Sequence, residues 1–125
     1  MNGPDLHRRA RSHAETLPGS VLDHPFGPDW EVYKVRGKVF MLVTAVTGPE
    51  IVIVKSAPED SKALRQTYSA ITPGYHMNKK HWITVAPNEE LPEAMLNDLI
   101  TDSYLLVVDK LPQARRPVDP RTFGQ

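Results

Sequence analysis

Apolar residues recur at helical spacing near both ends of the chain. In residues 5–17 the positions of one face lie three or four apart, and Pro18-Gly19 follows as a stop signal. The inward positions of this first segment are Leu6, Ala10, His13, Ala14 and Leu17. The corresponding positions of residues 91–111 are Met95, Leu96, Leu99, Ile100 and Tyr104. We therefore predict one helix in each segment.

The middle of the chain has the composition of strands. Runs rich in β-branched and aromatic residues cover positions 30–35, 38–44 and 51–55. Arg36-Gly37 between the first two runs predicts a tight hairpin, and Gly48-Pro49 predicts the next turn. A sheet of at least these three strands is expected.

Two further segments have recognisable local signals. SAPE at 56–59 is a capping-box sequence, which predicts a short helix ending near Tyr68, and HWITV at 81–85 predicts one more strand. The loop DHPFGPDW at 23–30 is expected to direct Phe26 towards the core.

These elements define the expected fold class. It is α+β, an antiparallel β-sheet with helices packed on one face, in the order α-β-β-β-α-β-α. Residues 1–112 are expected to form a single domain. The tail, residues 113–125, has no hydrophobic periodicity and is expected to be irregular or disordered.

The first hairpin predicts apolar residues on both faces of the sheet. If Val35 pairs with Lys38, Tyr33 lies opposite Phe40 with Leu42 beyond, while Trp30, Val32, Met41 and Val43 occupy the other face. Helices on one side alone would leave Tyr33, Phe40 and Leu42 partly exposed, and such a patch indicates a partner, a dimer or a covering segment. TPGYHMNKKHWITV at 72–85 is a candidate for that cover.

Composition and charge narrow the functional classes. The 125 residues include no cysteine, which excludes disulfides, thiolate metal sites and a cysteine nucleophile. No apolar run is long enough to span a membrane or to act as a signal peptide, so we expect a cytoplasmic protein without membrane contact. Net charge is zero, but residues 1–86 contain 11 basic and 8 acidic side chains, so any anion-binding surface is local.

Three long stretches resemble the MmcQ/YjbR family. They are PFGPDWEVYKVRGKVFML at 25–42, VKSAPEDSKALRQTYSAITPGYHMNKKHWITV at 54–85 and LITDSYLLVVDKLP at 99–112. The resemblance implies a compact CyaY-like, or frataxin-like, α+β fold, and members of the family are commonly described as DNA-binding proteins. Frataxins have acidic side chains on and near the first helix, whereas this one carries Arg8, Arg9 and Arg11, so iron binding is not expected.

Metal binding and catalysis are both weakly indicated in the 72–85 segment. His76 and His81 are five positions apart, a spacing that neither a helix nor a strand converts into a shared ligand pair. His24, His76 or His81 could act as an acid or base with Asp23 or Asp29, but no catalytic motif fixes their geometry. We expect a non-enzymatic protein with no metal ion and no cofactor.

Nucleic-acid binding would use two basic turns. The first offers Lys34, Arg36 and Lys38 to phosphates, and the second offers Tyr75, His76, Asn78, Lys79, Lys80 and His81. A purely structural interpretation stays open, in which Tyr75 and Trp82 pack in the core and the polar side chains satisfy backbone groups. The alternative function is a protein-interaction module or homodimer that uses the apolar face of Tyr33, Phe40 and Leu42.

Overall fold

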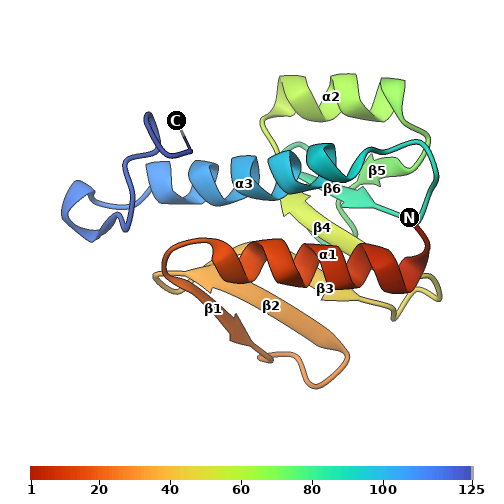
Figure 1. Cartoon of the computed structure of the whole chain (residues 1–125), viewed down its shortest axis with the longest axis horizontal. Helices are drawn as coiled ribbons and strands as arrows, with labels where there is room; N and C mark the ends of the chain where they lie inside the picture. The colour runs from red at the N-terminus through yellow and green to blue at the C-terminus, as the bar shows by residue number, and fades with distance from the viewer. Residues whose placement is uncertain (125) are drawn as a thin grey trace.

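Residues 1–124 are described by the computed structural model of this chain (Figure 1). In chain order, the elements are α1 (Gly3–Thr16), β1 (Ser20–Asp23), β2 (Trp30–Val35), β3 (Lys38–Thr44), β4 (Ile51–Lys55), α2 (Pro58–Thr67), β5 (Ile71–Pro73), β6 (Trp82–Val85), α3 (Glu93–Asp109) and the 3-10 turn η1 (Gln113–Arg115). None of the described helices combines the length and the apolar character that crossing a membrane requires.

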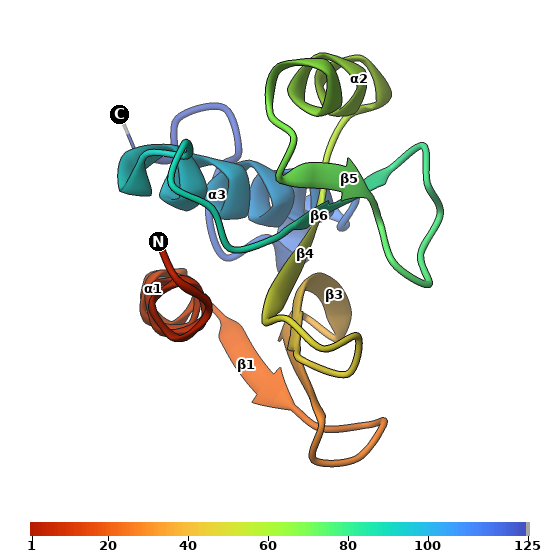
Figure 2. The same cartoon turned by 90° about the vertical axis from the view of Figure 1, so that its right-hand side faces the viewer.

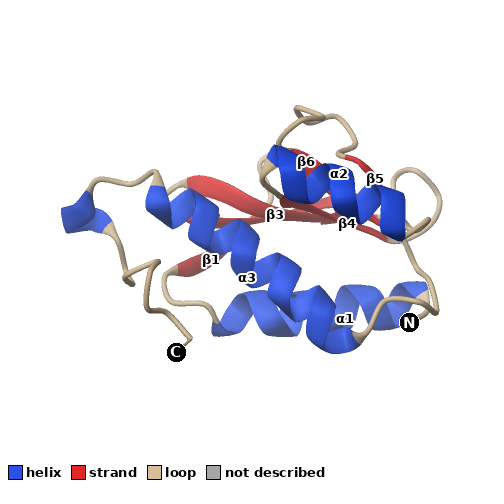
Figure 3. Cartoon of the chain, turned by 90° about the horizontal axis from the view of Figure 1, so that it is seen from above, coloured by secondary structure: helices blue, strands red, loops and turns tan. Residues whose placement is uncertain are grey.

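The strands form one antiparallel sheet of six strands in the order β1-β2-β3-β4-β6-β5. Helices α1 and α3 lie side by side on one face of this sheet, and α2 lies near the β5 end (Figures 1 and 3). The predicted class, an antiparallel α+β fold with three helices, is confirmed.

The arginines of α1 connect that helix to its neighbours. Asn2 caps the helix by accepting from the Asp5 amide at 2.8 Å. Arg9 forms an ion pair with Glu93 at the start of α3. Arg11 forms a bidentate pair with Glu31 of β2, with nitrogen–oxygen distances of 2.7 and 2.5 Å. Arg9 and Arg11 thus form ion pairs that hold α1 against α3 and the sheet.

Two strands are missing from the predicted order. β1 forms just before the loop expected at 23–30, in residues to which no element was assigned, and β5 forms just after α2, so the predicted order α-β-β-β-α-β-α is wrong. β1 has four residues and β5 has three, ending at Pro73, so neither contains enough alternating positions to give a periodic signal. Their pairing with β2 and β6 defines them as strands.

The capping box at the start of α2 does not form. Ala57, not Ser56, occupies the cap position, and Pro58 begins the helix. The Ser56 hydroxyl donates to the Ala57 carbonyl at a long 3.5 Å. With Ala57 at the cap, Ser56 lies outside the helix and Glu59 occupies the second helical position instead of the third, so the reciprocal hydrogen bonds of a capping box cannot form.

A β-bulge corrects the predicted faces of the first hairpin. Val35 pairs with Lys38 as expected, but the register shifts so that Lys34 pairs with Val39 and Tyr33 with Met41. Phe40 is the extra residue, and Phe40 and Met41 both join the core beneath the helices. Leu42 lies in a separate cluster on the opposite face. The prediction that Tyr33, Phe40 and Leu42 share one face is therefore wrong.

The helix side of the sheet contains the larger core, which we call the helix-face cluster. Leu6, Phe40, Leu96 and Tyr104 within it are completely buried. The Phe40 and Tyr104 rings meet edge to face, with centroids 5.4 Å apart. These contacts connect β3 to α3, and this face contains the main hydrophobic core.

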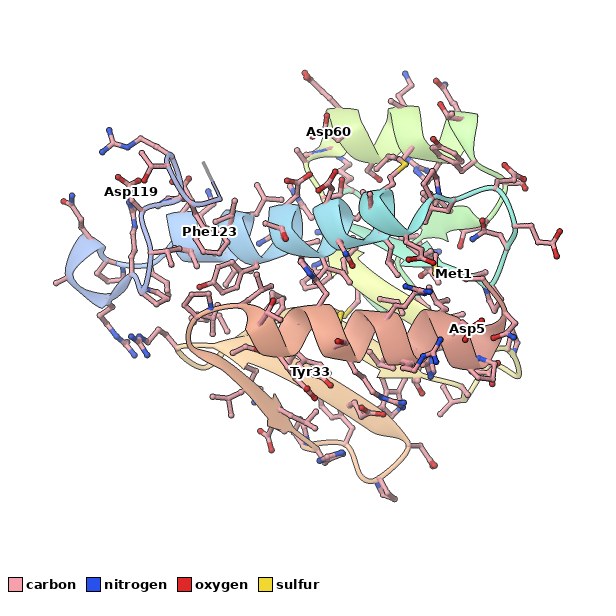
Figure 4. The ribbon with its side chains drawn as sticks, viewed as in Figure 1. Met1, Asp5, Tyr33, Asp60, Asp119 and Phe123 are labelled. Carbon is pink, nitrogen blue, oxygen red and sulfur yellow. The ribbon has the colours of Figure 1, made fainter. Side chains whose placement is uncertain are left out.

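The tail returns onto the core after η1. Val118 and Phe123 pack against the helix-face cluster, and the Phe123 ring centroid is 6.0 Å from that of Tyr104. The Arg36 guanidinium donates to the Arg115 carbonyl at 3.0 Å, which connects the β2–β3 turn to the tail. Figure 4 labels Phe123 beside the C-terminal end of α3.

Candidate nucleic-acid interface

The loop of residues 74–81 covers part of the sheet face that lies away from α1 and α3 (Figure 2). Beneath it is a second apolar cluster, the loop-face cluster. Its buried members are Val32, Leu42, Ile51, Ile53 and Trp82, with Trp30, Val39 and Met77 partly buried around them. Met77 of the 74–81 loop packs against this cluster. The loop therefore covers the face that contains Leu42, whereas Tyr33 and Phe40, which the 72–85 segment was also expected to cover, lie on the helix face.

Hydrogen bonds hold the 74–81 loop against the sheet at both ends. At its start, the Gly74 amide donates to the Trp82 carbonyl at 2.9 Å and the Tyr75 amide donates to the Thr84 hydroxyl at 2.9 Å. At its end, the Ser56 amide donates to the His81 carbonyl at 2.8 Å. Both ends of the loop are therefore attached to the sheet.

Gly74 permits the close approach of this loop to β6. A Cβ atom at position 74 would lie 2.5 Å from the Trp82 Cβ and 3.0 Å from its carbonyl carbon. His76 follows with a φ of 57°, in the left-handed region that residues other than glycine rarely adopt. Together these two positions turn the chain sharply and place the Tyr75 ring over the sheet.

Four rings form a continuous group, which we call the aromatic surface: Phe26, Trp30, Tyr75 and His76. Tyr75 stacks on Trp30 with centroids 6.3 Å apart and planes at 8°. Phe26 meets Trp30 edge to face at 6.5 Å, and His76 lies 4.1 Å from Tyr75. Phe26 is 66% exposed and Tyr75 36%, so the prediction that Phe26 points towards the core is wrong.

The lysines near this surface differ in their surroundings. Lys79 and Lys80 are exposed, and within residues 1–124 no ion pair involves either of them. Lys34 instead pairs with Asp23 at 3.0 Å, and the hydrogen bond from its ammonium holds the pKa of that carboxyl below the usual range. Lys34 is therefore less available to a ligand than the two loop lysines.

The two predicted basic turns do not form one site. Arg36 and Lys38 lie at the Val35 end of β2, where the Arg36 side chain contacts the tail. Tyr75 stacks on Trp30 at the other end of the same strand. Five residue steps along a strand separate the ends by about 17 Å. The structure thus separates Arg36 and Lys38 from the Tyr75 ring.

The remaining predicted residues have local structural roles. Asn78 accepts from the Lys80 amide through its side-chain oxygen at 3.0 Å, forming a turn of the Asx kind. His81 is exposed and contributes its backbone. Among the described residues, no three histidine or acidic side chains are placed to share a metal ion.

Sequence reasoning missed Phe26 and Trp30 as parts of the site. Both lie in or beside the PFGPDW segment, where Pro25 and Pro28 flank Gly27. Gly27 has a φ of 95°, a turn that lets the chain place Phe26 outside the sheet. Two aromatics around such a rigid loop are the signal from which an exposed aromatic group could have been inferred.

A cavity of about 560 Å³ adjoins the aromatic surface. Its lining includes Thr47, Ile51, Thr72, Tyr75, His76 and Lys79. The volume falls within the range of small-ligand sites, and the mixture of ring, hydroxyl and ammonium groups suits a planar polar group with an attached anion.

The fold and this loop define a class of small α+β protein whose antiparallel sheet has one helix-covered and one loop-covered face. The YjbR family matches residues 15–106. Uncharacterized protein YbdF of Escherichia coli O157:H7 is 50% identical over 111 residues, which covers 89% of this chain and 91% of that protein. Uncharacterized protein YjbR of Escherichia coli strain K12 is 36% identical over 90 residues, or 70% of this chain and 76% of that one.

Two solved structures are also similar to this chain in both fold and sequence. The crystal structure of Deinococcus radiodurans protein DR2400, with the domain DUF419, has a TM-score of 0.82 at 34% identity and covers 91% of this chain and 89% of that chain. A crystal structure from Pseudomonas syringae has a TM-score of 0.67 at 31% identity, covering 85% and 98% of the two chains. The chain therefore belongs to the YjbR family, and the resemblance seen in its sequence is confirmed.

Proposed function

We propose that this protein binds single-stranded nucleic acid on the loop-covered face of its sheet, without catalysing a reaction. The observation that carries the proposal is the aromatic surface, in which Tyr75 and Phe26 are exposed, beside the exposed Lys79 and Lys80. Proteins that bind single strands combine stacking rings with cations that follow the phosphates. The aromatic surface and the two lysines supply both parts.

A single strand suits this surface better than a duplex. Duplex binding by two basic turns would require them to act together, but Arg36 contacts the tail and Lys34 is paired with Asp23. Bases of a single strand are free to stack on exposed rings, whereas bases in a duplex are not. Members of the family are described as DNA-binding, and for this protein we propose that the DNA bound is single-stranded.

The surroundings of the two loop histidines support the non-catalytic part of this proposal. Within residues 1–124, no hydrogen bond from another side chain orients the ring of His76 or His81. A general base needs such an orienting partner to be positioned. The cytoplasmic location and the likeness to frataxin stay predictions that this proposal does not depend on.

The apolar face that the alternative function assigned to a protein partner or homodimer is buried. Tyr33 is 1%, Phe40 0% and Leu42 3% exposed, because helices cover the first two and the 74–81 loop lies over the cluster that contains the third. A protein partner would have to use Phe26 and Tyr75 instead. The salt dependence of binding distinguishes nucleic acid from a protein partner. Two phosphate contacts on a single strand make the logarithm of the binding constant fall with the logarithm of salt concentration with a slope of about −1.4, whereas apolar association does not weaken in this way.

The test is fluorescence anisotropy of a labelled oligothymidine of roughly 12 nucleotides, matching the site sizes of single-strand binders. We expect binding that weakens with salt, is lost in Lys79→Glu/Lys80→Glu and falls at least about fivefold in Tyr75→Ala, because stacking contributes about 1–3 kcal/mol per base. Lys62→Glu/Lys110→Glu changes the same charge at exposed positions on α2 and beyond α3, and should bind normally. Equal binding by all variants, or none by the unaltered protein at low salt, would overturn the proposal.

A further inference from the structure

A second cavity, on the helix side of the sheet, has the opposite charge. It measures about 730 Å³ and lies between α2, α3 and residues 120–121 of the tail. We call it the acidic groove. Its apolar lining includes Ala63 and Leu64 from α2 and Met95, Leu99, Leu105 and Leu106 from α3. Within α2, which is described throughout, only Ser61 is buried, so most of this helix is free to contact another molecule.

The apolar lining is bordered by carboxylates. Asp60 of α2 and Asp98, Asp102 and Asp109 of α3 all line the groove. Within residues 1–124 no ion pair involves any of these four. Figure 4 labels Asp60 at the start of α2, above α3 in that view.

Asp102 is affected by two of the other carboxylates. Loss of solvent, and then the charges of Asp98 and Asp60, raise the pKa of Asp102. Negative charges that repel one another beside apolar side chains are relieved when a cation with an apolar body binds. The cations already at the margin are Lys55 and Arg121, fewer than the four carboxylates.

The groove is long enough to hold a helix of several turns. Its lining on α3 runs from Met95 to Asp109, and a rise of 1.5 Å per residue makes this about 21 Å. An occupant of that length is a helix of about four turns. An acidic surface repels phosphates, which argues against nucleic acid and anionic lipid as occupants.

We propose that the acidic groove binds a basic amphipathic helix of a partner protein. Apolar side chains of that helix at helical spacing contact Leu64, Met95 and Leu99, while its lysines or arginines pair with Asp60, Asp98 and Asp102. This interaction is independent of nucleic-acid binding, because the two sites lie on different sides of the sheet and select opposite charges.

The test is an NMR titration of the ¹⁵N-labelled full chain with a designed helical peptide of about 14 residues, with leucine on one face and lysine elsewhere. A peptide with glutamate in place of lysine is the matched control. We expect amide shifts in residues 57–64 and 95–109 with the lysine peptide and none with the glutamate peptide. No shift there, or equal shifts with the glutamate peptide, would overturn the proposal.

Neutral variants test the charge contribution separately. Asp98→Asn/Asp102→Asn should weaken binding of the lysine peptide about tenfold, as expected when two charge contacts are lost. Glu15→Gln/Glu89→Gln removes the same charge from exposed positions outside the groove and should bind normally. If thermal melting shows that the aspartate variant is unfolded, Asp60→Asn on α2 replaces it with a smaller expected loss. Unchanged affinity in a folded groove variant would contradict the pairing.

Discussion

The two faces of the sheet are covered in different ways. On the helix face, α1 and α3 cover a continuous core in which Leu6, Phe40 and Tyr104 are fully buried. On the other face, a single loop covers a smaller cluster and leaves Phe26 and Tyr75 exposed beside it. Helices α1 and α3 bury the residues of the first face, whereas a short loop on the second face presents side chains to solvent. Stability and nucleic-acid binding should therefore depend on different faces.

The largest expected effect is the loss of core packing on the helix face. Leu96→Ala should lower the free energy of unfolding by about 2–5 kcal/mol, because Leu96 is completely buried and its removal leaves a cavity. Met77→Ala, in the half-buried loop cover, should cost less than half as much. Urea unfolding measures both. Equal losses of unfolding free energy in the two variants would mean that the two faces contribute equally to stability, contrary to the account.

A buried phenol gives the helix face a distinct pH dependence. Tyr33 is 1% exposed, and loss of solvent raises its pKa from 10.0 to about 12. Below pH 10 the phenol is neutral in both folded and unfolded states, so the stability is fully present. Between pH 10 and pH 12 the unfolded chain loses its proton first, and about 2–3 kcal/mol is lost as the pH rises.

The control for that pH dependence is Tyr33→Phe. No group among residues 1–124 hydrogen-bonds the Tyr33 hydroxyl, so its removal should change stability at neutral pH by less than about 1 kcal/mol. Urea midpoints measured from pH 9 to pH 12 should fall less steeply in the variant. Identical profiles for the two proteins would show that Tyr33 does not titrate as described.

The smallest of the three stability effects should also affect binding. Gly74→Ala forces a Cβ against Trp82 and should cost about 1–3 kcal/mol while displacing the Tyr75 ring. Gly37→Ala is the control: its Cβ meets nothing within 4 Å, so it should incur only left-handed strain, about 1–2 kcal/mol, and keep oligothymidine binding. Anisotropy and urea unfolding, measured together, detect whether the two variants differ. Normal binding by a folded Gly74→Ala protein would contradict the role given to the loop.

The sequence was sufficient to predict the elements with strong periodicity. The three helices and the hairpin at Arg36-Gly37 follow from hydrophobic spacing and from turn and helix-start residues. Arg36 and Gly37 both have positive φ, as a tight hairpin with this composition requires. Strong local signals therefore agree with the final fold.

Features that depend on contacts between distant segments were not predictable in this way. The bulge at Phe40 breaks the alternation of β3, so that Phe40 and Met41 both face the helices, and no local sequence signal marks it. The Lys34–Asp23 pair requires β1, a strand too short to recognise. The stack of Tyr75 on Trp30 joins residues 45 positions apart, so the site could be assembled only from the three-dimensional structure.

The most direct test of the account is an NMR titration of the ¹⁵N-labelled protein with oligothymidine at near-physiological salt. The account predicts amide shifts in residues 24–31 and 74–81, with α1, α3 and the Arg36-Gly37 turn unchanged. Shifts confined to the Arg36-Gly37 turn or to the helices would contradict the assignment of binding to the aromatic surface.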